Sequence, residues 1–110
     1  MTLRLALLLA VTLPALPAPA AEPSPDTRQL YEKKCASCHG DDGKAETKLG
    51  QKYKAKSFAS SAFQAKASDQ KLLDAIENGV QDTKMHPFKD KLSPDEIKAM
   101  VQMVRSFGPK

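Results

Sequence analysis

The residues best suited to chemistry in this sequence stand together in the segment Cys35-Ala36-Ser37-Cys38-His39. Two cysteines three positions apart at a helix end present both sulfur atoms along one edge of a flat ring. The histidine that follows then lies beneath the ring, where an imidazole nitrogen can bind a central metal ion. This is the pattern of c-type haem attachment, in which both thiols add to the vinyl groups of the porphyrin. We therefore predict one covalently bound haem c, held through Cys35 and Cys38, with His39 as an axial ligand of the iron.

Three other kinds of site use the same residue types, and each fits this sequence less well. A thioredoxin-like dithiol needs strand–helix surroundings, but no strand alternation is visible in the chain. A tetrahedral zinc site needs four ligands, and adjacent Cys38 and His39 cannot easily bind one zinc ion without strain. A disulfide between the two cysteines would close a very small loop and would stabilise little.

The N-terminal segment has the layout of a secretory signal peptide. Arg4 precedes a short apolar run at 5–13, and a small-x-small pattern ends at Ala20. The run is too short to span a bilayer as a helix, although an uncleaved anchor is the alternative. We expect cleavage after Ala20, a periplasmic location and no stable membrane insertion. The rest of the chain divides into a Pro-rich tether at 21–25 and one domain at 26–110.

The domain is short and poor in large side chains. Aromatic residues make up 5% of the chain, and Trp is absent. Domains of this size bury little apolar surface and usually need a disulfide, a metal or a cofactor. A haem is large, flat and mostly apolar, so it would fill the core.

Three helices are predicted, and the first two flank a long polar stretch. The first covers about 26–36, where Asp26 and Gln29 make a capping pair. The second covers 68–78 and ends at an Asn-Gly pair. The stretch between them, 40–67, is long for so small a domain, and such loops normally carry function or wrap a ligand.

The third helix has the clearest signals. Ser93 is its N-cap, Pro94 takes the first helical position, and Glu96 completes a capping box. Its apolar stripe recurs every three or four residues and ends before a Gly-Pro pair: Ile97, Met100, Val101, Val104 and Phe107. With a short helix expected near 60–66, the sequence predicts an all-α domain.

The second axial ligand must come from another part of the chain. Met100 and Met103 lie on the third helix, where a methionine usually fills gaps in a core. Met85 and His86 remain, in the loop between the second and third helices. On residue type alone, either side chain could bind the iron.

The order of export signal, helix, CxxCH, long loop, helix, Met–Pro loop and C-terminal helix resembles the class I cytochromes c. The small bacterial single-haem members are the most similar, and they share the segment Cys38-His39-Gly40-Asp41-Asp42-Gly43. The resemblance covers nearly the whole mature chain. It implies a small cytochrome c fold in which the N- and C-terminal helices pack together around one covalently bound haem. It also maps the family's methionine ligand to Met85 and the aromatic residue of the helix contact to Tyr31.

The sequence departs from the family pattern in three places. His86 is inserted between Met85 and Pro87, which makes His86 the alternative axial ligand. Met103 stands where many members carry an aromatic residue. No proline lies between His39 and Pro87. A different group must therefore accept the hydrogen bond that a proline carbonyl receives from the family's histidine.

With His39 and Met85 both bound, the iron has no open position, which favours outer-sphere electron transfer over catalysis. We therefore expect a monomeric electron carrier rather than an enzyme, with larger redox proteins as its donor and acceptor. One alternative is a haem enzyme or ligand sensor in which the Met85 ligand is labile or absent. Another is the haem subunit of a larger oxidoreductase complex.

Lysines gather near both ligand regions. They could steer acidic docking surfaces of redox partners, or they could serve only as a solvated surface. Nucleic acid is not expected as a partner, because the chain lacks a basic helix with interleaved aromatic residues. The lysines concerned are Lys33, Lys34, Lys44, Lys48, Lys52, Lys54, Lys56, Lys84 and Lys89.

Overall fold

The computed structural model describes residues 2–15 and 22–110. Residues 2–15 are exposed and have no regular secondary structure, and the expected cleavage site at Ala20 lies outside the described residues. None of the helices among the described residues is long and apolar enough to cross a membrane. The described part of the chain has no strands, which confirms the predicted all-α class, and it forms two helices more than predicted: α1 (Pro25–Lys34), α2 (Ala36–His39), α3 (Lys48–Tyr53), α4 (Ser61–Lys66), α5 (Asp69–Asn78) and α6 (Pro94–Ser106).

Helix α1 begins earlier than predicted. Its N-cap is Ser24, whose hydroxyl accepts a hydrogen bond from the Thr27 N–H at 3.2 Å. Pro25 takes the first helical position, where its missing N–H leaves no partner unsatisfied. Asp26 lies in the first turn, where its charge is favourable near the positive end of the helix dipole. The prediction of an Asp26–Gln29 capping pair was therefore wrong, because the Ser-Pro pair provides the helix start.

The long stretch between the first two predicted helices contains regular structure. Helix α4 lies where a short helix was expected, but α3 was not predicted. Its six residues include a glycine and no apolar periodicity, so its sequence carries little helical signal. Lys54 ends α3 in the left-handed conformation, at φ 55°.

Helices α5 and α6 confirm their sequence signals. Ser68 caps α5 by accepting a hydrogen bond from the Lys71 N–H at 3.1 Å. At α6, the Ser93 hydroxyl accepts from the Glu96 N–H at 3.1 Å, and the Glu96 carboxylate accepts from the Ser93 N–H at 2.9 Å. Both partners of the capping box are thus in place.

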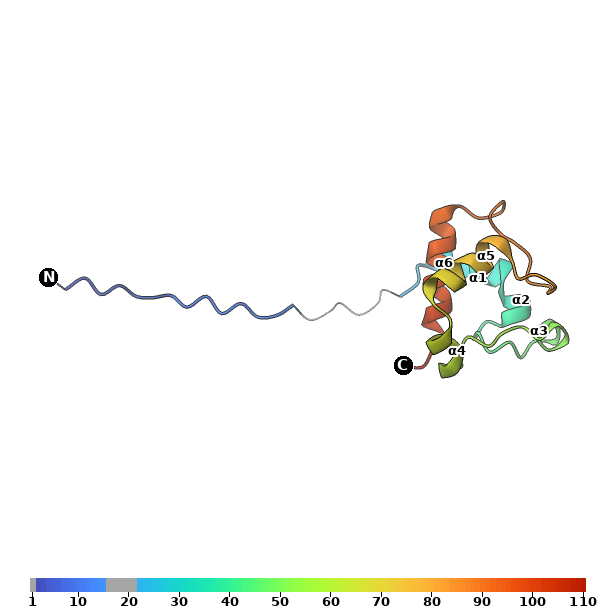
Figure 1. Ribbon diagram of the computed structural model, residues 1–110, viewed down its shortest axis with the longest axis horizontal. Helices are drawn as coiled ribbons and strands as arrows, with labels where there is room; N and C mark the ends of the chain where they lie inside the picture. The colour runs from blue at the N-terminus through green and yellow to red at the C-terminus, as the bar shows by residue number, and fades with distance from the viewer. Residues whose placement is uncertain (1, 16–21) are drawn as a thin grey trace.

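The N- and C-terminal helices pack together, as expected. Helix α6 contacts both α1 and α5, while α2 lies against α3 (Figure 1). Tyr31 of α1 is fully buried, with its ring centroid 5.0 Å from that of Phe107. Its hydroxyl donates a hydrogen bond to the Gly40 carbonyl at 2.7 Å, which ties the end of α2 to the core. Met100 and Met103 are also buried in the core. The aromatic partner of Tyr31 is Phe107, because position 103 carries a methionine.

Arg105 of α6 connects the corner between α4 and α5 to the core. Its guanidinium donates to the Gln64 carbonyl at 2.9 Å, to the Gln64 side-chain oxygen at 3.0 Å and to the Ala67 carbonyl. It also pairs with the Asp69 carboxylate at 2.8 Å. Hydrogen bonds from a charged donor are stronger than those from a neutral donor, so Arg105 holds these backbone carbonyls firmly.

Replacing Arg105 with Ala is expected to lower the free energy of unfolding by about 2–3 kcal/mol, because partly buried carbonyls lose a charged donor. Asp69→Asn is the control: the Asp69 side chain is 66% exposed, so its loss should cost less than about 1 kcal/mol. Urea denaturation of both variants measures the difference. Equal losses would mean that the ion pair, and not the contact with the carbonyls, holds this corner.

Candidate functional site

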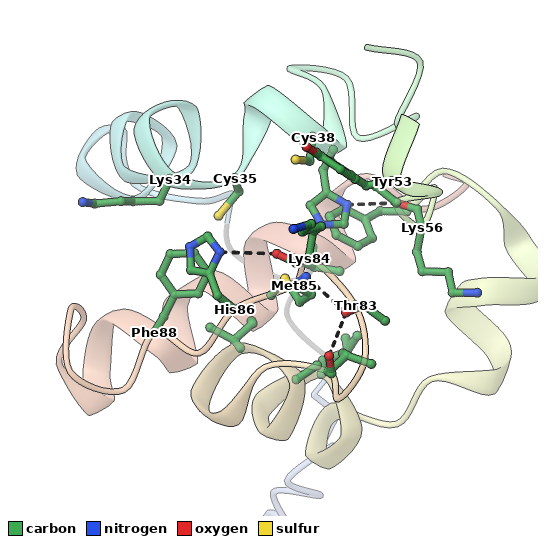
Figure 2. A pocket seen from close by; sticks show the side chains of 18 of the residues that line it. Lys34, Cys35, Cys38, Tyr53, Lys56, Thr83, Lys84, Met85, His86 and Phe88 are labelled. Atoms are coloured by element: carbon green, nitrogen blue, oxygen red, sulfur yellow. Dashed lines mark hydrogen bonds between the residues drawn. The ribbon is translucent and has the colours of Figure 1, made fainter. Parts of the chain in front are cut away.

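The residues predicted for the site all line one cavity. It has a volume of about 370 Å³, within the range of about 300–1,000 Å³ for small-molecule sites. Cys35 and Cys38 approach from the α1–α2 region, and Met85 and His86 from the loop after α5 (Figure 2). His39, the last residue of α2, lines the same cavity. Much of the wall is apolar and includes Phe58, Phe63, Leu72, Ile76, Phe88 and Val104.

The two cysteines form no disulfide and are partly buried. Figure 2 shows both sulfur atoms on the side of the cavity formed by α1 and α2. Burial, with a smaller contribution from Cys38, raises the pKa of Cys35 to about 11. Reactive redox dithiols instead lie in surroundings that lower the thiol pKa. The surroundings of Cys35 therefore do not favour a reactive thiolate.

The His39 imidazole is held at its edge and on its face. Nδ1 lies 3.0 Å from the Lys56 carbonyl oxygen. A carbonyl can only accept, so Nδ1 carries the hydrogen and Nε2 keeps its lone pair for a metal ion. The Phe58 ring stacks on the imidazole, with centroids 4.3 Å apart and an angle of 18° between the planes. Burial lowers the pKa of His39, against the opposing effect of the Lys56 bond, and so favours the neutral ring that ligates metals.

The expectation that another group replaces the family's proline carbonyl is thus confirmed, and the group is the Lys56 carbonyl. Sequence reasoning could not identify it, because any residue type can present a main-chain oxygen. The stacked Phe58 was missed as well. Its only signal was an aromatic residue in an otherwise polar stretch.

Helix α3 supports the attachment segment from outside the cavity. The Thr47 hydroxyl caps α3 and lies within hydrogen-bond distance of the Ser37 and Cys38 carbonyls, at 2.7 and 3.1 Å. Gly50 packs so closely that a Cβ atom there would collide with the Cys38 carbonyl oxygen. The Thr47 hydroxyl therefore supplies a donor for the carbonyls near the end of α2, from a part of the chain in which no helix was predicted.

The loop that carries Met85 is built by short-range hydrogen bonds. The Val80 N–H donates to the Met85 carbonyl at 2.9 Å. The Thr83 hydroxyl donates to the Val80 carbonyl at 2.7 Å and accepts from the Met85 N–H at 3.1 Å. The Phe88 N–H then returns to the Ile76 carbonyl at 2.9 Å, which fastens the loop to the end of α5.

Met85 and His86 differ in their surroundings. Met85 is partly buried and packs against the hydrophobic core, whereas His86 is exposed. The His86 ring lies against Phe88, with centroids 4.7 Å apart, and its Nδ1 is 3.3 Å from the Lys84 carbonyl (Figure 2). Met100 and Met103, which were assigned to the core, do not line the cavity.

The mouth of the cavity is basic. Five lysines line the cavity and no Asp or Glu is among the described residues that do so. Two ammonium groups lie near the Tyr53 ring of α3, with Lys52 Nζ 5.4 Å and Lys84 Nζ 5.7 Å from its centroid. Lys52 belongs to α3 itself, whereas the Lys84 contact joins α3 to the Met85 loop by cation–π attraction. The five lysines are Lys34, Lys54, Lys56, Lys71 and Lys84.

The terminal helices of this all-helical fold pack together, and the CxxCH segment lines its cavity. This combination defines a small c-type cytochrome. The family model described as cytochrome C oxidase, cbb3-type, subunit III matches residues 24–104, and the chain belongs to this family. It is similar to the structure of the KustC0563 c-type cytochrome, with 42% identity over 76% of this chain and 98% of that chain, at a TM-score of 0.70. A tyrosine-to-phenylalanine mutant of Kustc0563 matches with 43% identity over 74% of this chain and 98% of that chain, at a TM-score of 0.68. Comparison with curated protein sequences finds no match.

The family implies covalently bound haem c, and the residues present fit it. Two thiols that are not paired with each other border the same apolar cavity as an imidazole whose Nε2 is free. Cysteine thioethers and a histidine nitrogen are the groups that hold haem c. The chain is therefore a haem-c electron carrier.

Gly79, at the end of α5, lets the Met85 loop pass close to the helix. Its φ is 71°, and a Cβ atom there would lie 2.7 Å from the Met85 carbonyl oxygen and 2.9 Å from the Pro87 nitrogen. We expect Gly79→Ala to cost about 1–3 kcal/mol of stability through backbone strain. It should also weaken the far-red charge-transfer band expected from a bond between the Met85 sulfur and ferric iron.

Gln70→Ala is the control, since it also introduces an alanine, but at an exposed position of α5 outside the cavity. Thermal unfolding and the oxidised optical spectrum are measured on both variants. A Gly79→Ala protein with unchanged band and melting temperature would show that the loop does not depend on this close approach.

Proposed function

We propose that this protein is an exported, monomeric electron carrier with one haem c per chain, ligated by His39 and Met85. The observation that carries the proposal is the position of Met85, which lines the same cavity as Cys35, Cys38 and His39. The signal-peptide pattern that ends at Ala20 supports export to the periplasm.

Each residue has a distinct part in this proposal. Cys35 and Cys38 hold the cofactor covalently, and His39 binds the iron through Nε2 while the Lys56 carbonyl keeps Nδ1 protonated. Met85 offers a thioether, a soft ligand that favours ferrous iron and raises the reduction potential relative to a second imidazole. When bound, haem c supplies a one-electron Fe(III)/Fe(II) couple.

Ligation of the iron by two side chains suits electron transfer rather than turnover of a substrate. Two protein ligands would leave no open position on the iron, so a substrate would have no site at the metal. The hydrogen bonds around Thr83 and the packing of Met85 against the core restrict the sulfur to one side of the cavity. An apolar, covalently anchored site changes little between oxidation states, and each transfer then needs little rearrangement.

The name of the family suggests a second candidate, a permanent subunit of an oxidase. The matching family model is described as subunit III of a cbb3-type oxidase. Against this, the similar solved structure is described as a c-type cytochrome and not as part of an oxidase. We therefore favour a single-domain shuttle.

Ligation is tested by comparing Met85→Ala with His86→Ala. We expect Met85→Ala to abolish the far-red sulfur-to-iron band of the oxidised protein, to lower the reduction potential, and to allow carbon monoxide to bind the reduced protein. His86→Ala should change none of these, because His86 is exposed and lies against Phe88. The reverse pattern would identify His86 as the ligand. Rapid binding of carbon monoxide to the native protein would favour a sensor or an enzyme.

We further propose that the basic mouth of the cavity attracts acidic surfaces of the donor and the acceptor. Lysines line the cavity from four separate parts of the chain, and no carboxylate offsets them among the described lining residues. A localised positive field raises association rates with negative partners, and salt screens it.

The rate of electron exchange with an acidic redox protein is expected to fall as ionic strength rises. Lys34→Glu, at the cavity, should slow the reaction several-fold at low salt. Lys98→Glu, on the exposed face of α6 and outside the cavity, carries the same charge change and should have a much smaller effect. An exchange rate that stays constant or rises with ionic strength would exclude electrostatic steering. Equal effects of the two variants would mean that the steering charges do not lie at the cavity.

A further inference from the structure

One short segment, 56–58, contacts the His39 imidazole in two different ways. The Lys56 carbonyl accepts the hydrogen bond from Nδ1 at 3.0 Å, in the plane of the ring. The Phe58 ring covers one face of the imidazole, with centroids 4.3 Å apart and planes 18° from parallel. The edge contact fixes where Nδ1 points, and the face contact fixes how the ring plane is turned.

The Phe58 ring is itself held in place. Phe58 is buried, its N–H donates to the Gly43 carbonyl at 2.7 Å, and its carbonyl accepts from the Gln64 amide at 2.8 Å. On its other sides the ring meets Phe63, with centroids 5.4 Å apart, and Phe107, with centroids 6.2 Å apart. The same Gln64 amide also donates to the Val104 carbonyl of α6. The plane that faces the imidazole is therefore anchored to the core.

We propose that Phe58 is a positioning residue that sets the rotation of the His39 imidazole about its metal-binding axis. This rests on the proposed role of His39 as an axial ligand. A hydrogen bond to a carbonyl tolerates a broad range of angles, so the Lys56 contact alone leaves the ring free to tilt. A stacked planar face removes that freedom. Neighbours that orient a ligating histidine tune the metal, and here an aromatic ring adds to the usual hydrogen-bond acceptor.

The orientation of the imidazole can be read directly by NMR of the oxidised haem protein. The spread of the paramagnetically shifted haem-methyl signals depends on how the plane of the axial ligand is turned. In Phe58→Leu, which keeps apolar volume but loses the flat face, we expect the spread to narrow because the ring samples more orientations. Phe58→Tyr keeps the flat face and should retain the native pattern.

Phe88→Leu is the matched control, since Phe88 lines the same cavity and its ring lies against His86 rather than against Phe58 or His39. It removes the same atoms from the wall and should leave the methyl pattern unchanged. Phe58→Met removes the flat face with a longer side chain, so that a folding defect of the leucine variant does not decide the result. An unchanged pattern in Phe58→Leu or Phe58→Met would overturn the proposal, as would an equal change in Phe88→Leu.

The wild-type protein separates this proposal from the one on which it rests. If the oxidised wild type lacks the far-red sulfur–iron band, His39–Met85 ligation fails whatever the variants show. If that band is present in wild type and in all the variants, the bond to Met85 persists, so a difference in methyl pattern is not caused by loss of that ligand.

Discussion

The hydrogen bond between His39 Nδ1 and the Lys56 carbonyl is the contact on which the arrangement of the site depends. It joins the attachment turn to a segment seventeen residues later, and it leaves Nε2 of the imidazole as the atom available to iron. Helix α3 lies between these two segments. Its capping residue, Thr47, contacts the carbonyls of the attachment turn, and its Gly50 allows the two backbones to meet. The polar stretch after CxxCH is therefore the structure that aims the histidine.

The hydrophobic core and the cofactor site share one set of side chains. Phe58, Leu72, Ile76 and Phe88 are buried and also line the cavity. A domain this small cannot bury enough surface to be stable by a wide margin. A large apolar group in the cavity would thus act as part of the core. The walls of the cavity accordingly come from α5, α6 and the loops and not from one element.

The loop after α5 determines which side chain faces that group. Gly79 lets the chain fold back on α5, and the hydrogen bonds around Thr83 set the direction of Met85. The extra residue before Pro87 is accommodated by turning His86 outward against Phe88. The inserted histidine therefore lengthens the family's Met–Pro pair without moving Met85 out of the cavity.

The features that sequence alone determined are local ones. The haem-attachment segment, the caps of α5 and α6 and the apolar stripe of α6 each depend on residues within a few positions of one another, so their types and spacing suffice. Even locally, the predicted Asp26–Gln29 capping pair was wrong, because Ser24 and Pro25 provide the start of α1. Tertiary structure alone decided the acceptor for His39, the stacking of Phe58 and the different exposure of Met85 and His86. The first is a main-chain oxygen that any residue carries, and the other two depend on which surfaces the folded chain brings together.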